Sequence, residues 1–322
     1  MRNLLFRDAI REALIEEMQL DETIILMGED IGPGGMFGVT EGFVDRFGEG
    51  RIIDMPIAET AIVGGAIGAA VNGLRPVAEI MHSDFIFVCM DGICNVAAKF
   101  RFASGGKAGV PITIRTPSGA SGWGLHHGQS LEACFSNVPG LKLVMPSTPY
   151  DAKGLLKASI RDNDPVIFFE NKASYKTTGE VPEETYTIPL GRADIKKPGK
   201  DVTLIAWGVM IRVALEAAAD LAGEGISCEV IDPRTIIPLD EKTILESVAK
   251  THRAVIVHEA PKIGGFGGEI AATIAEKVFH ELNAPVVRVG APYMPVPRRP
   301  FEEHYLPNKE KIIRAVKKNF YR

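Results

Sequence analysis

The sequence lacks a hydrophobic run long enough to cross a bilayer. Its most apolar stretch, Ala61–Val71, is too short and too rich in glycine for a spanning helix. The N-terminal "MRNLLFRDAIREAL" has the pattern of an amphipathic helix and lacks the features of a signal peptide. These absences predict a cytoplasmic protein without a membrane partner.

Basic stripes and paired metal-binding cysteines are also missing. The net charge is -5 with acids and bases interspersed, which argues against nucleic acid as a partner. The four cysteines lack the spacing of metal ligands, so buried free thiols are favoured and a zinc site is the alternative. They are Cys89, Cys94, Cys134 and Cys228.

What the chain does have is a regular alternation of short β-rich runs with Ala-rich helical stretches. Strands such as "TIILMG", "RPVAEIM" and "PVIFFE" are continuously apolar, which predicts an α/β fold with a mostly parallel sheet covered on both faces. The alternation stops in a polar stretch rich in Gly and Pro and then restarts. We therefore expect a domain at 1–183, a linker at 184–200 and a smaller α/β domain at 201–322.

Loops that follow strands are the first candidates for a ligand site. No GxxxxGK[ST] phosphate loop is present. "GGFGGEI" (264–270) favours a tight strand-to-helix turn over a nucleotide site, because no acid lies at dinucleotide spacing. "GEDIGPGGMFG" (28–38) also follows a strand, and its paired acids, which include Glu29, are unusual for a merely flexible loop.

Two adjacent histidines, His126 and His127, lie in the Gly/Ser-rich loop "TPSGASGWGLHHGQS". A histidine in such a loop could transfer protons near neutral pH, or it could only hydrogen-bond locally. No nucleophilic Ser or Cys accompanies the pair, so a hydrolase triad is not supported.

Glu59 leads the Gly- and Ala-rich run "ETAIVGGAIGAAVNG". An acid in the first turn of a helix complements the helix dipole, which is one interpretation. The glycines behind it each cost roughly 1 kcal/mol of helix propensity relative to Ala, so they indicate that something packs very closely. A carboxylate at that position would be partly desolvated and suited to sharing a proton.

Several segments together resemble a known family. They are "MGEDIG", "PIAETAIVGGAIGAAVNGLRPVAEIM", "DGICNVAAKFRF", "VIDPRTIIPLD" and the long run from "LHHGQSLEACFSNVPG" to "NDPVIFFE". In this order they are similar to the β-subunit of the thiamine-diphosphate-dependent first component of 2-oxo-acid dehydrogenase complexes, of the pyruvate, branched-chain and acetoin types. The resemblance covers essentially the whole chain. It implies a pyrimidine-binding domain with a parallel sheet, followed by a transketolase C-terminal-like α/β domain.

The resemblance also implies roles for individual residues. Glu59 corresponds to the catalytic glutamate that shares a proton with the cofactor's aminopyrimidine ring, and Phe85 to the aromatic wall beside that ring. Glu29 is assigned to cofactor binding. His127 corresponds to the active-site histidine of an "HSQ"-like triplet, although Gly follows it here and His126 is a second candidate. A potassium site would use Ile112, Ser159, Ile160, Asp162 and Asp164.

One motif of thiamine enzymes is absent: the GDG…NN sequence that holds Mg²⁺ and the diphosphate. The resemblance therefore implies an α-subunit that supplies this half of the cofactor site in an α2β2 heterotetramer. It further implies docking to a lipoylated acyltransferase core.

The predicted function is oxidative decarboxylation of a 2-oxo acid, or cleavage of acetoin, with acyl transfer to lipoamide. Half of a split transketolase or of a deoxyxylulose-phosphate-synthase-like enzyme is the alternative enzyme. A non-catalytic assembly subunit is the alternative of another class, and Glu59 argues against it.

Overall fold

The computed structural model describes residues 1–321, which form two compact units. Unit 1 comprises Met1–Ser118 and Cys134–Leu190, and unit 2 comprises Gly119–Ala133 and the chain from Gly191 onward. The polypeptide therefore contributes to unit 2 twice, first through a short loop and then through its C-terminal part.

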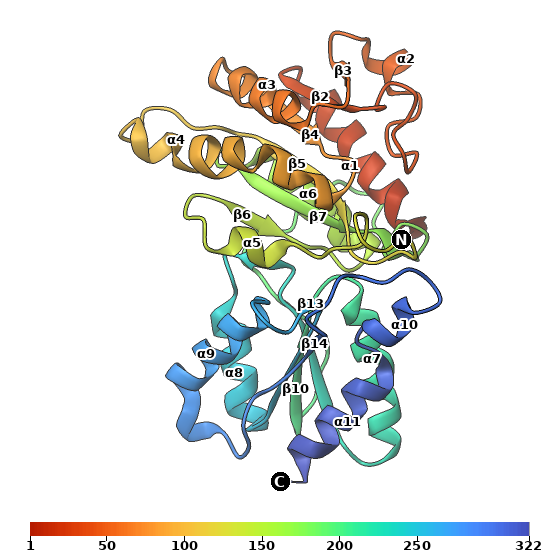
Figure 1. Cartoon of the computed structure of the whole chain (residues 1–322), viewed down its shortest axis with the longest axis vertical. Helices are drawn as coiled ribbons and strands as arrows, with labels where there is room; N and C mark the ends of the chain where they lie inside the picture. The colour runs from red at the N-terminus through yellow and green to blue at the C-terminus, as the bar shows by residue number, and fades with distance from the viewer. Residues whose placement is uncertain (322) are drawn as a thin grey trace. The chain divides into compact units, whose positions relative to one another are not determined.

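Unit 1 is built on parallel strands in the order β6-β7-β5-β4-β2-β3 (Figure 1). Every adjacent pair in this series is parallel. This arrangement confirms the predicted fold class, because continuous apolar strands joined by helices give a parallel sheet. The strands are β2 (Ile24–Glu29), β3 (Ile52–Met55), β4 (Arg75–Glu79), β5 (Thr113–Ser118), β6 (Lys142–Val144) and β7 (Val166–Asn171).

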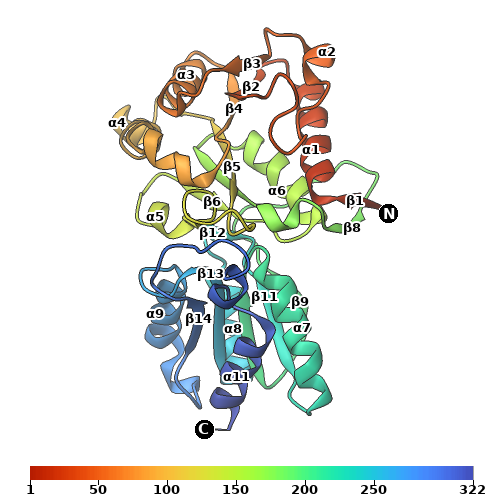
Figure 2. The same ribbon diagram turned by 45° about the vertical axis from the view of Figure 1, so that its right-hand side comes forward.

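Helices cover both faces of this sheet (Figure 2). On one face, α1 (Phe6–Leu20) packs against α6 (Pro149–Arg161), and their apolar side chains share one core with β2 and β7. Helix α6 begins with proline, and the Thr148 hydroxyl accepts a hydrogen bond from the Asp151 amide at 3.1 Å. On the other face lie α3 (Glu59–Val71), the 3₁₀ segment η1 (Ser83–Cys89), the π-helical segment η2 (Gly92–Ala97) and α4 (Ala98–Ala103).

Short elements complete unit 1. An antiparallel ribbon pairs β1 (Arg2–Leu5) with β8 (Thr178–Val181), so a strand precedes the predicted N-terminal helix. The remaining elements are α2 (Phe43–Phe47), η3 (Lys172–Ser174) and α5 (Glu132–Ser136), the last of which begins in the loop of unit 2.

Unit 2 has a second sheet, in the order β14-β13-β10-β11-β9. Its strands are parallel except β9, which pairs antiparallel with β11 at the edge. Strand β9 (Asp194–Lys197) lies inside the range expected to be a linker. The other strands of this sheet are β10 (Val202–Ala206), β11 (Cys228–Asp232), β13 (Ala254–Pro261) and β14 (Val287–Ala291). The short strand β12 (Thr235–Ile237) belongs to unit 2 but not to this sheet.

The helices of unit 2 also form two layers (Figure 1). Helices α7 (Met210–Gly223) and α11 (Lys309–Phe320) share an apolar core with β10 and β11 on one face. Helices α8 (Glu241–Thr251) and α9 (Gly267–Val278) lie on the opposite face, and η4 (Phe279–Glu281) and α10 (Glu302–Tyr305) are short. Among residues 1–321, no helix is both long and apolar enough to cross a membrane.

Candidate active site

The predicted cofactor-binding residues of unit 1 lie where three neighbouring parallel strands end. Glu29 is the last residue of β2, and its register partner on β3 is Met55. Four residues after Met55, Glu59 begins α3, and Phe85 follows the end of β4 within η1. Because carboxyl ends of parallel strands meet at one edge of a sheet, the fold brings Glu29, Glu59 and Phe85 to the same edge.

Glu59 occupies the first position of α3 and its side chain is buried, with a residue exposure of 8%. The residue before it, Ala58, gives no side-chain cap, so the carboxylate stands at an uncapped helix N-terminus. Within residues 1–321, no side chain or amide forms a hydrogen bond or ion pair with this carboxylate. Glu59 therefore fits both interpretations of the sequence, because it is an acid in the first turn of a helix and it is also largely buried.

Glu59 interacts electrostatically with Glu29. Burial raises the pKa of Glu29, and the charges of Asp30, Glu59 and Asp54 raise it further. Burial also raises the pKa of Cys89 to about 12, with a smaller contribution from Glu59. Asp30 adopts a left-handed backbone with φ 56°, which Asp tolerates better than most residues. At this edge of the sheet, burial and neighbouring acids therefore raise the pKa of Glu29.

Aromatic rings lie beside this edge. The Phe85 ring is half-buried, and its centroid lies 5.6 Å from that of His82 in an edge-on arrangement. Phe37 makes a similar contact with His82 at 6.1 Å and stacks on Tyr175 at 4.7 Å. The Thr60 hydroxyl donates to the Val88 carbonyl at 2.9 Å, which fixes α3 against the segment that carries Phe85.

A buried ionic network behind the site was not predicted from the sequence. Arg115 donates to the Glu170 carboxylate at 2.6 and 2.9 Å and to the Glu79 carboxylate at 2.6 Å. The Tyr175 hydroxyl also donates to Glu170, at 2.5 Å. The sequence did contain a signal, because each of these three apolar strands carries a charged residue. The register of the strands was needed to show that Glu79, Arg115 and Glu170 lie together.

The two histidines lie in unit 2, in the loop Gly119–Ala133. His126 is exposed and His127 is half-buried, with its ring 5.8 Å from that of Trp123. The His127 amide donates to the Gly124 carbonyl at 2.9 Å, which closes a tight turn. A side chain at Gly128 would come within 2.9 Å of Val296, so the position after His127 has no room for serine.

The predicted potassium ligands gather around the turn between α6 and β7. One Arg75 nitrogen, Nη1, donates to the carbonyls of Ile160 and Asp162 at 3.1 and 3.0 Å. Lys142 and Arg101 pair with the carboxylates of Asp162 and Asp164. The two other predicted ligands also have partners: the Ile112 carbonyl accepts from the Val166 amide at 2.9 Å, and the Ser159 hydroxyl donates to the Leu155 carbonyl at 2.8 Å.

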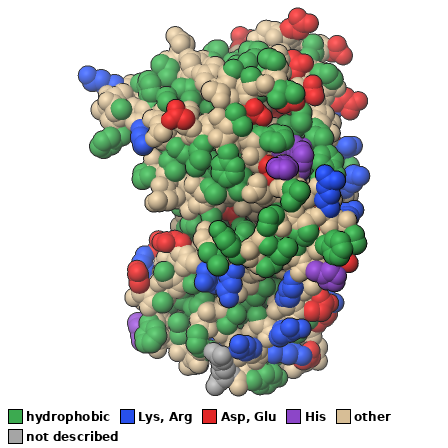
Figure 3. All heavy atoms as spheres, viewed as in Figure 1, with side chains coloured by type: hydrophobic (Ala, Val, Ile, Leu, Met, Phe, Trp, Pro, Cys, Tyr) green, Lys and Arg blue, Asp and Glu red, His purple; other side chains and the backbone are tan. Residues whose placement is uncertain are grey.

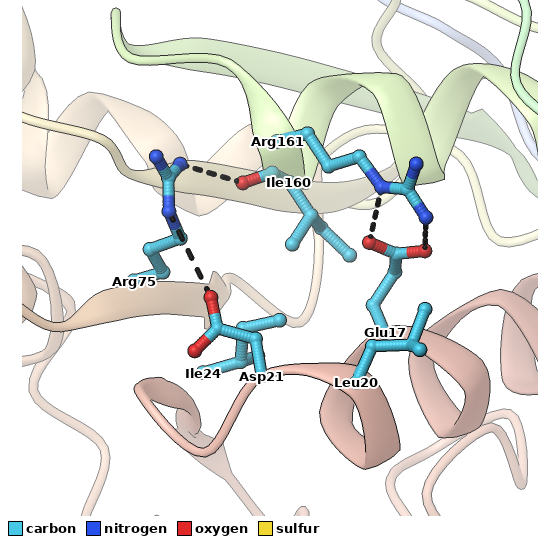
Figure 4. Close-up of a pocket in the computed structure, with 7 residues that line it drawn as sticks. All are labelled: Glu17, Leu20, Asp21, Ile24, Arg75, Ile160 and Arg161. Atoms are coloured by element: carbon cyan, nitrogen blue, oxygen red, sulfur yellow. Dashed lines mark hydrogen bonds and ion pairs between the residues drawn. The ribbon is translucent and has the colours of Figure 1, made fainter.

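A cavity of about 320 Å³ opens beside this turn. Figure 4 shows Arg75 and Ile160 on one side of it and the ion pair of Arg161 with Glu17 on the other. The seven lining residues are Glu17, Leu20, Asp21, Ile24, Arg75, Ile160 and Arg161. Its arginines are already paired, so the cavity offers no free charge to a ligand.

The cysteines do not come together. Cys89 and Cys228 are buried, Cys94 is half-buried and Cys134 is exposed, and all four are free thiols. Across residues 1–321, no cluster of His, Cys, Asp or Glu has the geometry of a metal site.

Two family models match the chain. "Transketolase, pyrimidine binding domain" covers residues 2–178 and "Transketolase, C-terminal domain" covers residues 191–312. A solved structure described as "Split gene transketolase, inactive beta4 tetramer" superposes with a TM-score of 0.81 over 99% of this chain and 98% of its own. Its sequence identity is 24%, so this likeness concerns the fold.

Curated relatives are much closer in sequence. The acetoin:2,6-dichlorophenolindophenol oxidoreductase subunit beta of Bacillus subtilis is 50% identical, covering 95% of this chain and 94% of the relative. The 2-oxoisovalerate dehydrogenase subunit beta of the same organism is 46% identical, covering 96% of each chain. Its pyruvate dehydrogenase E1 component subunit beta is 44% identical, covering 99% of each.

Proposed function

We propose a function from the premise that this chain belongs to the family of β-subunits of thiamine-diphosphate-dependent 2-oxo-acid and acetoin dehydrogenases. The chain acts as the β-subunit of such a first component. It takes part in the decarboxylation of a 2-oxo acid or the cleavage of acetoin, and the acyl group passes to lipoamide. The observation that carries the proposal is the desolvated Glu59 carboxylate at the head of α3.

The residues at the strand ends suit the pyrimidine half of the cofactor. Glu59 has no partner among the described residues, so its carboxylate is available to a nitrogen of the bound ring. Burial raises the pKa of the neighbouring Glu29, and the half-buried ring of Phe85 offers an apolar wall. Bound thiamine diphosphate would supply the carbon that attacks the substrate carbonyl. Glu59 would hold and move the proton at the pyrimidine nitrogen.

The diphosphate half of the site calls for a partner chain. The GDG…NN motif is absent from the sequence, so an α-subunit would supply the Mg²⁺ and diphosphate ligands. Unit 1 also exposes apolar side chains over α3, η1, η2 and α4, where Figure 3 shows a concentration of hydrophobic atoms. They are Val71, Phe87, Val88, Val96 and Phe102, the last 93% exposed. Such a surface suits a subunit interface in a heterotetramer.

His127 would act on the substrate or acyl group, with His126 as the alternative, and the lipoylated acyltransferase would receive the acyl group. Replacing each histidine with asparagine in the reconstituted enzyme and measuring acyl transfer to lipoamide would separate them. The potassium site remains a prediction, because the carbonyls of Ile160 and Asp162 already accept from Arg75. A melting temperature that rises with K⁺ but not with Na⁺ would support it.

Activity assays with candidate substrates would identify the substrate. The reconstituted enzyme should turn over acetoin, pyruvate or a branched-chain 2-oxo acid in a lipoamide-dependent assay. Transfer of two-carbon units between sugar phosphates, without lipoamide turnover, would instead support the split-transketolase alternative.

Glu59→Gln tests the catalytic assignment. With the proton-sharing group removed, we expect turnover to fall roughly 10²–10⁴-fold while the subunits still assemble. Glu49→Gln, an exposed acid of the same unit, is the matched control and should retain full activity. Full activity of Glu59→Gln would contradict the proposal.

A further inference from the structure

The loop that carries the histidines is held at its start by two buried carboxylates of unit 2. The Ala120 amide donates to the carboxylate of Glu259, and the Gly122 amide donates to that of Glu302 at 2.6 Å. Glu259 and Glu302 are 5% and 6% exposed. The Ala120 side chain also packs into a small apolar cluster with Ala291, Val296, Tyr305 and Leu306.

The segment 296–299 follows the loop closely. The Leu125 amide donates to the Val296 carbonyl at 2.8 Å, and Arg298 Nε donates to the Trp123 carbonyl at 3.0 Å. Gly122 and Gly124 have φ values of +94° and +69°. A Cβ at Gly122 would come within 2.8 Å of Arg299, and one at Gly124 within 2.6 Å of Arg298. Backbone conformation and space both require glycine here.

The end of the loop is fixed just as firmly. Glu132 is fully buried and accepts hydrogen bonds from Trp207 Nε1 at 3.0 Å and from the Ser130 hydroxyl at 2.8 Å. The Trp207 ring stacks on His258, with ring centroids 5.3 Å apart. Between these two ends, Leu125 and His126 are exposed and His127 is half-buried, so this part of the loop reaches the surface.

We infer that Glu302 is a positioning residue for His127, which it places by holding the Gly122 amide five residues earlier in the same loop. This inference rests on the proposed function of His127. The neighbouring Glu303 is exposed and forms no hydrogen bond or ion pair with the loop within residues 1–321. The role therefore falls to Glu302 alone and not to every acid of α10. Because a displacement of about 1 Å at a reacting group can cost roughly 10²-fold in rate, the predicted effect is on kcat.

The experiment uses the full chain reconstituted with its α-subunit. Glu302→Ala should lower kcat roughly 10- to 100-fold. Glu302→Gln keeps an oxygen that can accept from Gly122 and should recover most of that loss, and Glu303→Ala should match the wild type. In a His127→Ala background, Glu302→Ala should cause little further loss, because the two residues then act through one step.

Hydrogen exchange gives a readout independent of activity. In the full chain, the peptide covering residues 119–131 should exchange faster in Glu302→Ala than in the wild type, Glu302→Gln or Glu303→Ala. Unchanged exchange in Glu302→Ala, or additive losses in the double variant, would overturn the inference. Should Glu302→Ala not fold, Arg298→Met breaks the contact with Trp123 and should likewise speed loop exchange and lower kcat. Full activity of His127→Ala would instead refute the proposed role of His127, while the exchange result still decides whether Glu302 holds the loop.

Discussion

Two arginines of unit 1 make nearly the same contact in different surroundings. Arg115 and Glu170 form a bidentate pair at 2.6 and 2.9 Å with side chains 1% and 0% exposed. Arg161 and Glu17 form one at 2.8 and 2.8 Å, but the Arg161 side chain is 49% exposed (Figure 4). Arg115→Met and Arg161→Met therefore contrast the loss of a fully buried arginine with the loss of a half-exposed one.

The expected magnitudes differ several-fold. Arg115→Met leaves two carboxylates, Glu79 and Glu170, buried without their cation, which should lower the free energy of unfolding by about 3–5 kcal/mol. Arg161→Met removes a half-exposed arginine and leaves the buried Glu17 carboxylate with Lys157 at 3.7 Å, so it should cost at most about 1 kcal/mol. Urea unfolding of the full chain, followed by circular dichroism with m-values compared, measures both.

The pH dependence of the Arg115→Met deficit adds a second test. Burial raises the pKa of Glu79 in the folded protein, and Arg115 opposes that rise. An acid with a raised folded pKa stabilises the protein below its unfolded pKa, and this stability is lost as the pH rises through the folded pKa. Without Arg115 the folded pKa of Glu79 rises further, so the deficit should be largest at neutral pH and shrink on acidification. Equal losses in the two arginine variants, or a deficit independent of pH, would refute this reasoning.

Three further predictions concern single positions. Burial lowers the pKa of the His258 imidazole, so unit 2 should lose stability as the pH falls below about 6.5. In thermal melts, His258→Asn should make the melting temperature less dependent on pH, whereas His280→Asn, at an exposed position, should not. Gly140→Ala should cost about 1–3 kcal/mol because its Cβ would lie 1.9 Å from the Ala98 carbonyl, and Gly50→Ala, with open space around it, is its control. Asp240→Ala should lower the free energy of unfolding by about 1 kcal/mol, because Asp240 caps α8 by accepting a hydrogen bond from the Thr243 amide at 3.2 Å. A melting temperature equal to that of the wild type would contradict this prediction.

The main layers of the fold could be predicted from the sequence because they depend on local patterns. Runs such as "TIILMG" and "PVIFFE" are apolar throughout and became β2 and β7. Strand β9 was missed because it lies at a sheet edge, where "DIKK" is polar and partly exposed. Its sequence therefore has the composition of a linker.

Only part of the candidate site could be predicted from the sequence. The sequence placed Glu59 at the start of a glycine-rich helix, and α3 begins there. Arg115, Glu79 and Glu170 could not be grouped in advance, because each belongs to a different strand. The register pairs Glu79 with Arg115 directly, and Glu170 lies two residues along β7 from Phe168, the partner of Arg115. Long-range contacts such as Glu302 with Gly122, 180 residues apart, have no local signature at all.

Unit 2 is built from two separate parts of the sequence. This limits the positions at which two related subunits can be joined to make a chimera. A cut near residue 190 separates the loop Gly119–Ala133 from the carboxylates Glu259 and Glu302 that bind its backbone. A chimera joined there from two related subunits would combine one parent's histidine loop with the other parent's anchors. Exchanging residues 119–133 together with the C-terminal part would keep each loop with its own supports, and is the unit in which substrate preference could be transplanted.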